Sequence, residues 1–194
     1  LRGSDPVLGV EMASTGEVAC FGATREEAFL KALLSTGFKM PKTNILVSVQ
    51  STLQDQFTHS AWQLHELGYT LWATDATYEV LKKNHVPCRN VAYPTEEAGT
   101  EERPNALDLI RDGTIGLCIN IPTHESKRVK DNYLMRRTAV DFGLPLLTNT
   151  NLVKCFADAI YAHNRDKGLE PKTLFEHYES EKDSDAWTSP SEFH

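Results

Sequence analysis

Short apolar runs alternate along the chain with longer segments whose apolar residues fall at helical spacing. The apolar runs have the length and composition of buried strands: NILVSV (44–49), TLWAT (70–74), CRNVAY (88–93), GLCINI (116–121) and PLLT (145–148). The helical segments are residues 55–67, 78–83, 106–111, 126–142 and 152–162. This alternation predicts an α/β fold, an open parallel five-stranded sheet with helices on both faces and right-handed crossovers.

A further helix is predicted ahead of the first strand. Thr24 is followed three residues later by Glu27, which is the capping-box pattern of a helix start. Gly37 is typical of a helix stop, and Pro41 cannot continue a helix. The apolar residues between start and stop fall at helical spacing: Ala28, Phe29, Ala32 and Leu33.

These patterns divide the chain into four pieces. Residues 1–38 hold a turn-rich opening and the extra helix, residues 39–43 are a linker, and residues 44–164 form the α/β domain. Residues 165–194 are an acidic tail rich in Glu, Asp, Lys and Ser, with one helical turn predicted near 174–178. Because this tail has no sustained apolar period, we expect it to be partly disordered.

Composition limits the classes of function. The 194 residues are 40% hydrophobic, enough for one main domain with a core, and the formal net charge of -7 argues against nonspecific binding to nucleic acid or anionic lipid. No apolar run reaches the roughly 18 residues that span a bilayer, and the N-terminus lacks the pattern of a secretory signal. Because the chain begins at Leu1, we expect a fragment or a processed piece, in which a targeting sequence would not be visible.

Cysteine and histidine spacing predicts no metal site. The four cysteines form no CxxC pair, and three lie in apolar surroundings, which favours a reduced compartment. His59 and His65 are six residues apart and would lie on different faces of a helix.

Polar residues follow every predicted strand, at the edge where parallel sheets bind ligands. The following segments are QSTLQDQ, TDAT, YPTEEAG, NIPTHESK and TNTN. Most carry hydroxyl or amide side chains, so they predict one pocket rich in neutral hydrogen-bonding groups. The chain has no GxSxG elbow, no phosphate-binding P-loop and no GxGxxG, and only His124 closely follows a strand as a general base would. We therefore expect a recognition site for a small anion and name no catalytic residue.

Each candidate residue also has a purely structural interpretation. Thr74 and Thr77 would serve as helix caps, the commoner role of Thr before a helix. Tyr93 would be an ordinary strand end. Asn120, inside an apolar run, would tie down a neighbouring loop, since a buried amide must be hydrogen-bonded or costs about 1 to 3 kcal/mol. Lys127, in the first turn of a predicted helix, would be solvated, unless a nearby anion offsets the helix dipole.

Several long motifs resemble one family. PVLGVEMASTGEV resembles the end of the second ATP-grasp unit of the large carbamoyl-phosphate synthetases, and AFLKALLSTGFKMP resembles the helix and linker that follow it. LIRDGTIGLCIN and DNYLMRRTAVDFGLPLLTN resemble the regulatory domain, which has the methylglyoxal synthase fold. The resemblance implies a remnant of an ATP-grasp domain in residues 1–38 and a methylglyoxal synthase-like allosteric domain in residues 44–164.

Within this family the chain is most similar to the urea-cycle type of vertebrate mitochondria, which N-acetyl-L-glutamate activates. The resemblance implies a mitochondrial matrix location, no cofactor in this segment, and a parent enzyme that uses ATP and Mg. It also implies the catalytic ATP-grasp halves of the same parent chain as partners. Whether the nitrogen comes from ammonia or from glutamine stays open.

The same resemblance implies an activator site after the second, third and fourth strands. The matching residues are Thr74, Thr77, Tyr93, Asn120, Thr123, Lys127 and Asn132. The two Thr hydroxyls and backbone NH groups are expected to hold one carboxylate, with Tyr93 packed on the acetamide. The other carboxylate or the acetamide is expected to bind the Asn and Lys side chains. Tyr93 and Thr123 depart from the family, which has tryptophan and asparagine there, so they affect the expected affinity.

Two rival functions follow from the same family. Nucleotide-regulated relatives, which sense UMP or IMP, place a phosphate-binding hydroxyl where this chain has Pro122, and their ornithine-binding Tyr-Asp-Thr is replaced by LTN. A free-standing methylglyoxal synthase carries a Gly-Gly-Asp loop where this chain has IPTHESK. Both departures favour the N-acetyl-L-glutamate hypothesis.

Overall fold

The computed structural model describes residues 18–96, 100, 102–122, 128–165, 169, 172–173 and 175–176. The strands are β1 (Asn44–Val49), β2 (Thr70–Thr74), β3 (Cys88–Val91), β4 (Leu117–Ile121) and β5 (Leu146–Leu147). The helices are α1 (Arg25–Ser35), α2 (Gln54–Glu66), α3 (Asp75–Lys83), α4 (Ala106–Arg111), α5 (Val129–Asp141) and α6 (Thr150–Arg165), with a short 3-10 helix η1 (Ser51–Leu53) before α2.

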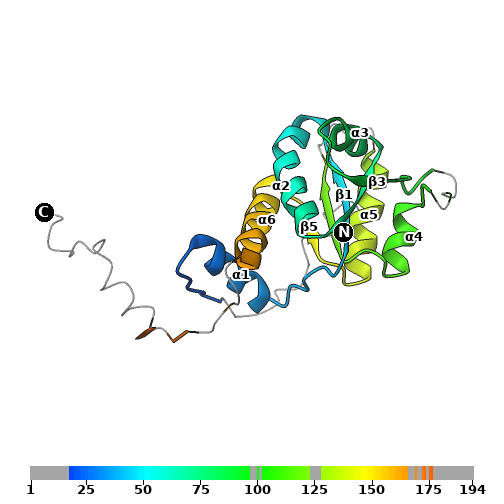
Figure 1. Cartoon of the computed structure of the whole chain (residues 1–194). Helices are drawn as coiled ribbons and strands as arrows, with labels where there is room; N and C mark the ends of the chain where they lie inside the picture. Colours follow the sequence, from blue (N-terminus) through cyan, green and yellow to red (C-terminus); the bar gives the residue numbers. More distant parts are fainter. Residues whose placement is uncertain are drawn as a thin grey trace, which may run out of the picture.

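All neighbouring strands of the sheet are parallel, in the order β3-β2-β1-β4-β5. The predicted open five-stranded sheet is therefore confirmed (Figure 1). β1 lies at the centre and is buried along almost its whole length, which explains its nearly continuous apolar sequence. The chain crosses from one half of the sheet to the other between β3 and β4, so the strand order reverses where β4 lies beside β1.

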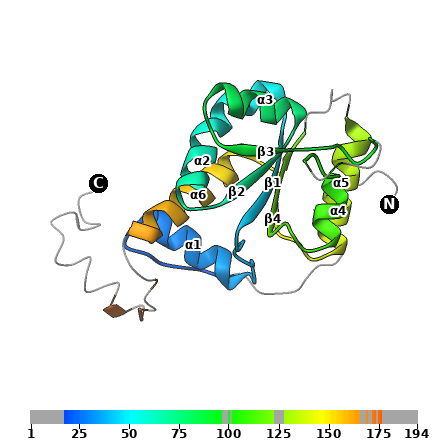
Figure 2. The same cartoon turned by 45° about the vertical axis from the view of Figure 1, so that its right-hand side comes forward.

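Helices cover both faces of the sheet and make three layers (Figure 2). On one face the core joins Leu30 of α1, Phe57 of α2, Leu81 of α3 and Phe156 of α6 to alternate strand residues. On the other face α4 and α5 pack over the remaining strand residues. Each strand thus has apolar side chains directed to both layers, as a fully covered parallel sheet requires.

The predicted helix before β1 is confirmed, and it packs on α6. The Thr24 hydroxyl accepts a hydrogen bond from the Glu27 N–H at 3.1 Å, while the Glu27 carboxylate reaches the Ala23 N–H at 2.7 Å instead of the N–H of Thr24 itself. Gly37 has a φ of 81°, a backbone conformation that suits glycine at a helix end. The Leu30 side chain is only 1% exposed, so this helix contributes to the core of the α/β layers.

Element boundaries differ from the prediction mainly at helix starts. α3 begins at Asp75, three residues before the predicted start, because its first turn is polar and carries no apolar period. α5 begins at Val129, and residues 123–127, which include the predicted first turn, lie outside the described residues. The last part of the tail, residues 177–194, also lies outside them.

Candidate functional site

A row of buried polar side chains crosses the carboxyl ends of the three central strands. Ser48 of β1 is in register with Asn120 of β4, and the Thr74 hydroxyl of β2 donates a hydrogen bond to the Ser48 hydroxyl at 3.0 Å. All three lie on the sheet face that α4 and α5 cover, since they alternate with residues of the opposite face. The row lies where the strand order reverses, which is the usual ligand-binding position of an open α/β sheet.

The amide of Asn120 extends this row to α5. Its Nδ2 donates a hydrogen bond to Asn132 Oδ1 at 3.0 Å, and Asn120 is fully buried. Within the described part of the chain, Asn120 Oδ1 has no hydrogen-bond partner. A buried acceptor without a partner costs free energy, so it marks a place where a donor from a ligand or water would be stabilising.

The two predicted threonines have different surroundings, and neither hydroxyl caps a helix. Thr74 occupies the N-cap position of α3, but its side chain makes no capping hydrogen bond and bonds Ser48 instead. The Thr77 hydroxyl accepts from the Val49 N–H at 2.9 Å and donates to the Val49 carbonyl at 3.2 Å. The capping interpretation is therefore wrong for both, because the buried end of β1 offers these hydroxyls closer partners.

Tyr93 follows β3 and borders the same edge. Its side chain is buried, its carbonyl accepts a hydrogen bond from Asn105 Nδ2 at 3.1 Å, and the Arg128 guanidinium lies 4.1 Å from its ring centre. Asn105 also accepts from the Leu107 N–H at 2.9 Å and so caps α4. The position of Tyr93 is therefore fixed by α4 on one side and by a cation on the other.

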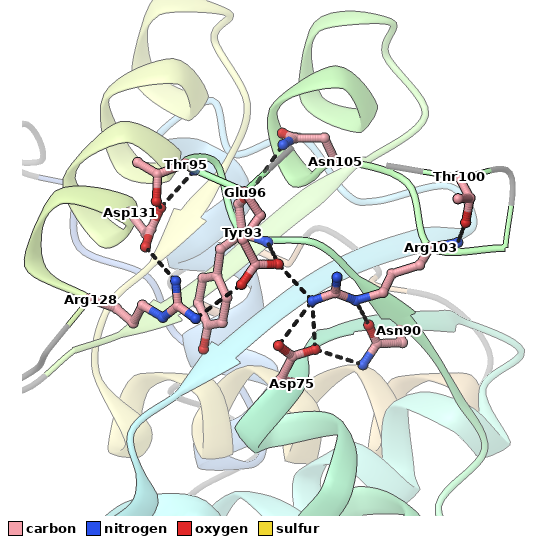
Figure 3. Close-up of polar contacts among 10 residues, drawn as sticks. All are labelled: Asp75, Asn90, Tyr93, Thr95, Glu96, Thr100, Arg103, Asn105, Arg128 and Asp131. Carbon is pink, nitrogen blue, oxygen red and sulfur yellow. Dashed lines mark hydrogen bonds and ion pairs between the residues drawn. The ribbon is translucent and has the colours of Figure 1, made fainter. Parts of the chain in front are cut away.

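A chain of alternating charges, which sequence analysis missed, links the loops around Tyr93 (Figure 3). Arg103 contacts Asp75 at 2.9 Å and Glu96 at 2.7 Å. Arg128 contacts Glu96 at 3.0 Å and Asp131 at 3.3 Å. We call this set the charge chain: Asp75, Arg103, Glu96, Arg128 and Asp131. It ties the start of α3 and the loop after β3 to the start of α5.

The ends of the charge chain are anchored by further hydrogen bonds. Asp131 Oδ1 accepts from the Thr95 N–H at 2.9 Å and from the Thr95 hydroxyl at 2.7 Å, and the residue is only 3% exposed. Asn90 accepts from Arg103 Nε at 2.6 Å and donates to Asp75 at 3.1 Å. These bonds fix both ends, which reduces the side-chain entropy lost on ligand binding.

Both arginines of the charge chain remain cationic. Partial burial acts to lower the pKa of Arg103, but its hydrogen bonds to Asp75 and Glu96 outweigh that effect and raise the pKa. Burial likewise opposes the charge of Arg128, while Asp131 and Glu96 raise its pKa. The edge therefore carries two permanent cations beside the buried polar row, and the carboxylates of Asp75, Glu96 and Asp131 pair with them.

Two predicted site residues, Thr123 and Lys127, lie outside the described residues. The structure brings together Thr74, Asn120 and Asn132 in one buried row and places Tyr93 beside the charge chain. Thr77 lies at the end of β1, bonded to Val49. Ser48 was not predicted, although a serine inside the apolar run of β1 is the same signal that identified Asn120.

The four cysteines are free, and burial raises the pKa of Cys118 to about 12 and that of Cys88 to about 11, so these two thiols stay protonated at neutral pH. A cavity of about 370 Å³ opens at the opposite, amino-terminal edge of the sheet, and no predicted site residue lines it. Among the described residues there is no cluster of metal-ligating side chains, and none of their helices is long and apolar enough to cross a membrane.

Comparison with known proteins gives the class of protein to which this fold belongs. Residues 56–148 match a family model described as the MGS-like domain, and this segment belongs to that family. The chain is 49% identical over 178 residues to the protein named carbamoyl-phosphate synthase (ammonia), mitochondrial, of Homo sapiens. That alignment covers 92% of this chain and 12% of the relative. The resemblance seen in the motifs is thereby confirmed.

Further relatives extend the comparison. The protein of the same name from Aquarana catesbeiana is 47% identical over 178 residues, 92% of this chain and 12% of the relative. Multifunctional protein pyr1-3 of Dictyostelium discoideum is 44% identical over 166 residues, 82% of this chain and 7% of that protein. The chain therefore corresponds to a small part of much longer multidomain relatives.

Proposed function

We propose that this chain is the allosteric regulatory domain of a carbamoyl-phosphate synthase and that it binds N-acetyl-L-glutamate at the carboxyl ends of β2, β3 and β4. The main supporting observation is the buried Asn120 Oδ1, which has no partner among the described residues. N-acetyl-L-glutamate carries an amide N–H, which supplies the donor that this acceptor lacks. Asn132 and the predicted Lys127 serve the neighbouring carboxylate or acetamide oxygen.

The hydroxyl row supplies donors for a second carboxylate. Thr74 donates to Ser48, and the proton of the Ser48 hydroxyl has no acceptor among the described side chains. A carboxylate placed beside Ser48 receives this proton as a charge-assisted hydrogen bond, which is about twice as strong as a neutral one. Ser48 thus joins the predicted residues of the activator site.

Thr77 is able to redirect its proton without leaving a buried acceptor unpaired. The Val49 carbonyl that accepts from Thr77 also accepts from Gln54 Nε2 at 2.9 Å. When the Thr77 proton turns toward a ligand carboxylate, Gln54 still satisfies this carbonyl. The hydroxyl keeps its bond from the Val49 N–H, so its oxygen stays in place.

The regulatory role has a thermodynamic requirement. Catalysis takes place in other domains of the parent enzyme, which forms carbamoyl phosphate from bicarbonate, an amino nitrogen donor and ATP. The effector activates only if it binds the active state more tightly, by a coupling typically of about 1 to 3 kcal/mol. The mitochondrial relatives support a location in the mitochondrial matrix.

Calorimetric titration of the 194-residue chain with N-acetyl-L-glutamate, UMP and IMP tests this proposal. We expect saturable heat from N-acetyl-L-glutamate, with one ligand per chain. N-acetyl-L-glutamine, which replaces the side-chain carboxylate with a neutral amide, is the matched control ligand and should bind more weakly. Heat from UMP or IMP alone would overturn the choice of ligand, and formation of methylglyoxal from dihydroxyacetone phosphate would overturn the regulatory role.

A further inference from the structure

The carboxylate of Glu96 is surrounded by donors from three directions. Its Oε2 accepts from Arg103 Nη2 at 2.7 Å and from the Tyr93 N–H at 3.3 Å, and its Oε1 accepts from Arg128 Nη2 at 3.0 Å. Figure 3 shows the two guanidinium groups on either side of this carboxylate. Two cations and one backbone N–H that converge on one carboxylate have the chemistry of an anion receptor.

The donors of this arrangement do not depend on Glu96 for their positions. Arg103 is also held by the Asp75 carboxylate and by Asn90, and Arg128 is also held by Asp131 and the Tyr93 ring. If the Glu96 carboxylate swings into solvent, the receptor therefore keeps its shape. Such preorganisation lowers the cost of binding a replacement anion.

The receptor is also accessible. The side chains of Arg103 and Arg128 are 40% and 42% exposed, and that of Glu96 is 25% exposed. Ion pairs at this level of exposure are weak and exchange readily. A carboxylate from solution can therefore replace the Glu96 carboxylate with no change in the number of charges in the receptor.

We propose that Arg103, Arg128 and the Tyr93 N–H form a carboxylate receptor that Glu96 occupies when no effector is bound. Glu96 then competes with a ligand carboxylate for the receptor. Arg103 and Arg128 join the residues that select a ligand with two carboxylates. The assignment of N-acetyl-L-glutamate as the natural occupant rests on the proposed function, whereas the receptor itself does not. The receptor lies beside Tyr93, so one carboxylate bound there would keep the acetamide near the ring.

Glu96→Gln tests the proposal, because glutamine keeps the shape of the side chain but loses the charge that competes. We expect the Kd for N-acetyl-L-glutamate, measured by calorimetry, to fall by about three- to ten-fold, the range expected when weak exposed ion pairs no longer compete. Glu79→Gln, the same charge change at an exposed position of α3, is the matched control and should leave the Kd unchanged. An unchanged Kd in Glu96→Gln, or an equal fall in both variants, would overturn the proposal.

A double variant separates local competition from a general change in charge. If the higher affinity of Glu96→Gln for N-acetyl-L-glutamate comes from the receptor, adding Arg128→Gln should abolish most of that increase. If the gain persists without Arg128, the receptor does not bind the ligand and the proposal fails.

Sodium acetate provides a probe that is independent of the natural effector. In nitrogen-15 NMR spectra of Glu96→Gln, acetate should shift the Arg103 and Arg128 Nε–H signals and the Tyr93 amide signal along saturable curves. The wild-type chain should need about three- to ten-fold more acetate, for the same competitive reason. Acetate binding without N-acetyl-L-glutamate binding would refute the proposed function and leave the receptor standing. N-acetyl-L-glutamate binding with no acetate shifts in the variant would refute the receptor and leave the proposed function standing.

Discussion

At the scale of single residues, hydroxyl and amide groups at the strand ends have distinct partners. Thr74 bonds another side chain, Thr77 bonds the backbone of β1, and Asn120 keeps one buried acceptor without a partner in the described part of the chain. Asn120 was predictable because an amide stands out in an apolar run. The charge chain was not predictable, because its partners lie up to 32 residues apart and single charged residues occur all along the sequence.

Thr77→Val should lower the free energy of unfolding by about 1 to 3 kcal/mol, since the buried Val49 N–H would lose its acceptor. Thr77→Ser keeps the hydroxyl and is the matched control, so it should lower the free energy of unfolding by a much smaller amount. Urea denaturation of the two variants measures the difference. No loss of stability in Thr77→Val, or a larger loss in Thr77→Ser, would show that the methyl group of Thr77, and not its hydroxyl, matters for folding.

Asn120→Leu should separate ligand binding from stability. Leucine cannot accept from the ligand amide, so we expect N-acetyl-L-glutamate binding to weaken by at least about ten-fold, which corresponds to about 1.4 kcal/mol. The free energy of unfolding should change by less than about 1 kcal/mol, because the lost hydrogen bond from Asn120 to Asn132 is offset by the removal of a buried acceptor that has no partner among the described residues. Calorimetry and urea denaturation measure the two effects. An unchanged affinity of Asn120→Leu for N-acetyl-L-glutamate would show that Asn120 does not contact the ligand.

At the scale of elements, apolar runs predicted every strand, and helical spacing predicted where most helices lie. The start of α3 was missed because the strand TLWAT passes directly into a polar first turn. The packing of α1 was also not predictable, since its sequence shows an apolar stripe but not the surface that covers it. The structure supplies that surface through α6 and the Phe38–Phe156 ring contact, whose centres lie 5.6 Å apart.

Leu30→Ala tests whether α1 contributes to the stability of the α/β domain. Leu30 is 1% exposed in the core, so truncation should lower the free energy of unfolding by about 2 to 5 kcal/mol. Leu34, on the same helix but 37% exposed, is the matched control. Leu34→Ala should lower the free energy of unfolding by a much smaller amount. Similar small losses at both positions, measured by urea denaturation, would show that α1 is attached only loosely.

At the scale of the whole molecule, the strand order decides which residues meet. Periodicity predicts a parallel sheet, but it does not say that β4 lies beside β1, and this pairing is what brings Asn120 next to Ser48. The same order places the site where the two halves of the sheet separate. The charge chain then connects α3, the loop after β3 and α5 across that edge, so a ligand bound there would contact elements from both halves.

The most direct test of the central claim is an NMR titration of the full chain with N-acetyl-L-glutamate, followed through the side-chain amide signals of Asn120 and Asn132. We predict saturable shifts of both signals, with a Kd equal to the calorimetric value, while the amides of Gly113 and Gly116 at the opposite edge stay unchanged. Shifts confined to Gly113 and Gly116, or no saturable shift at Asn120 and Asn132, would contradict the account.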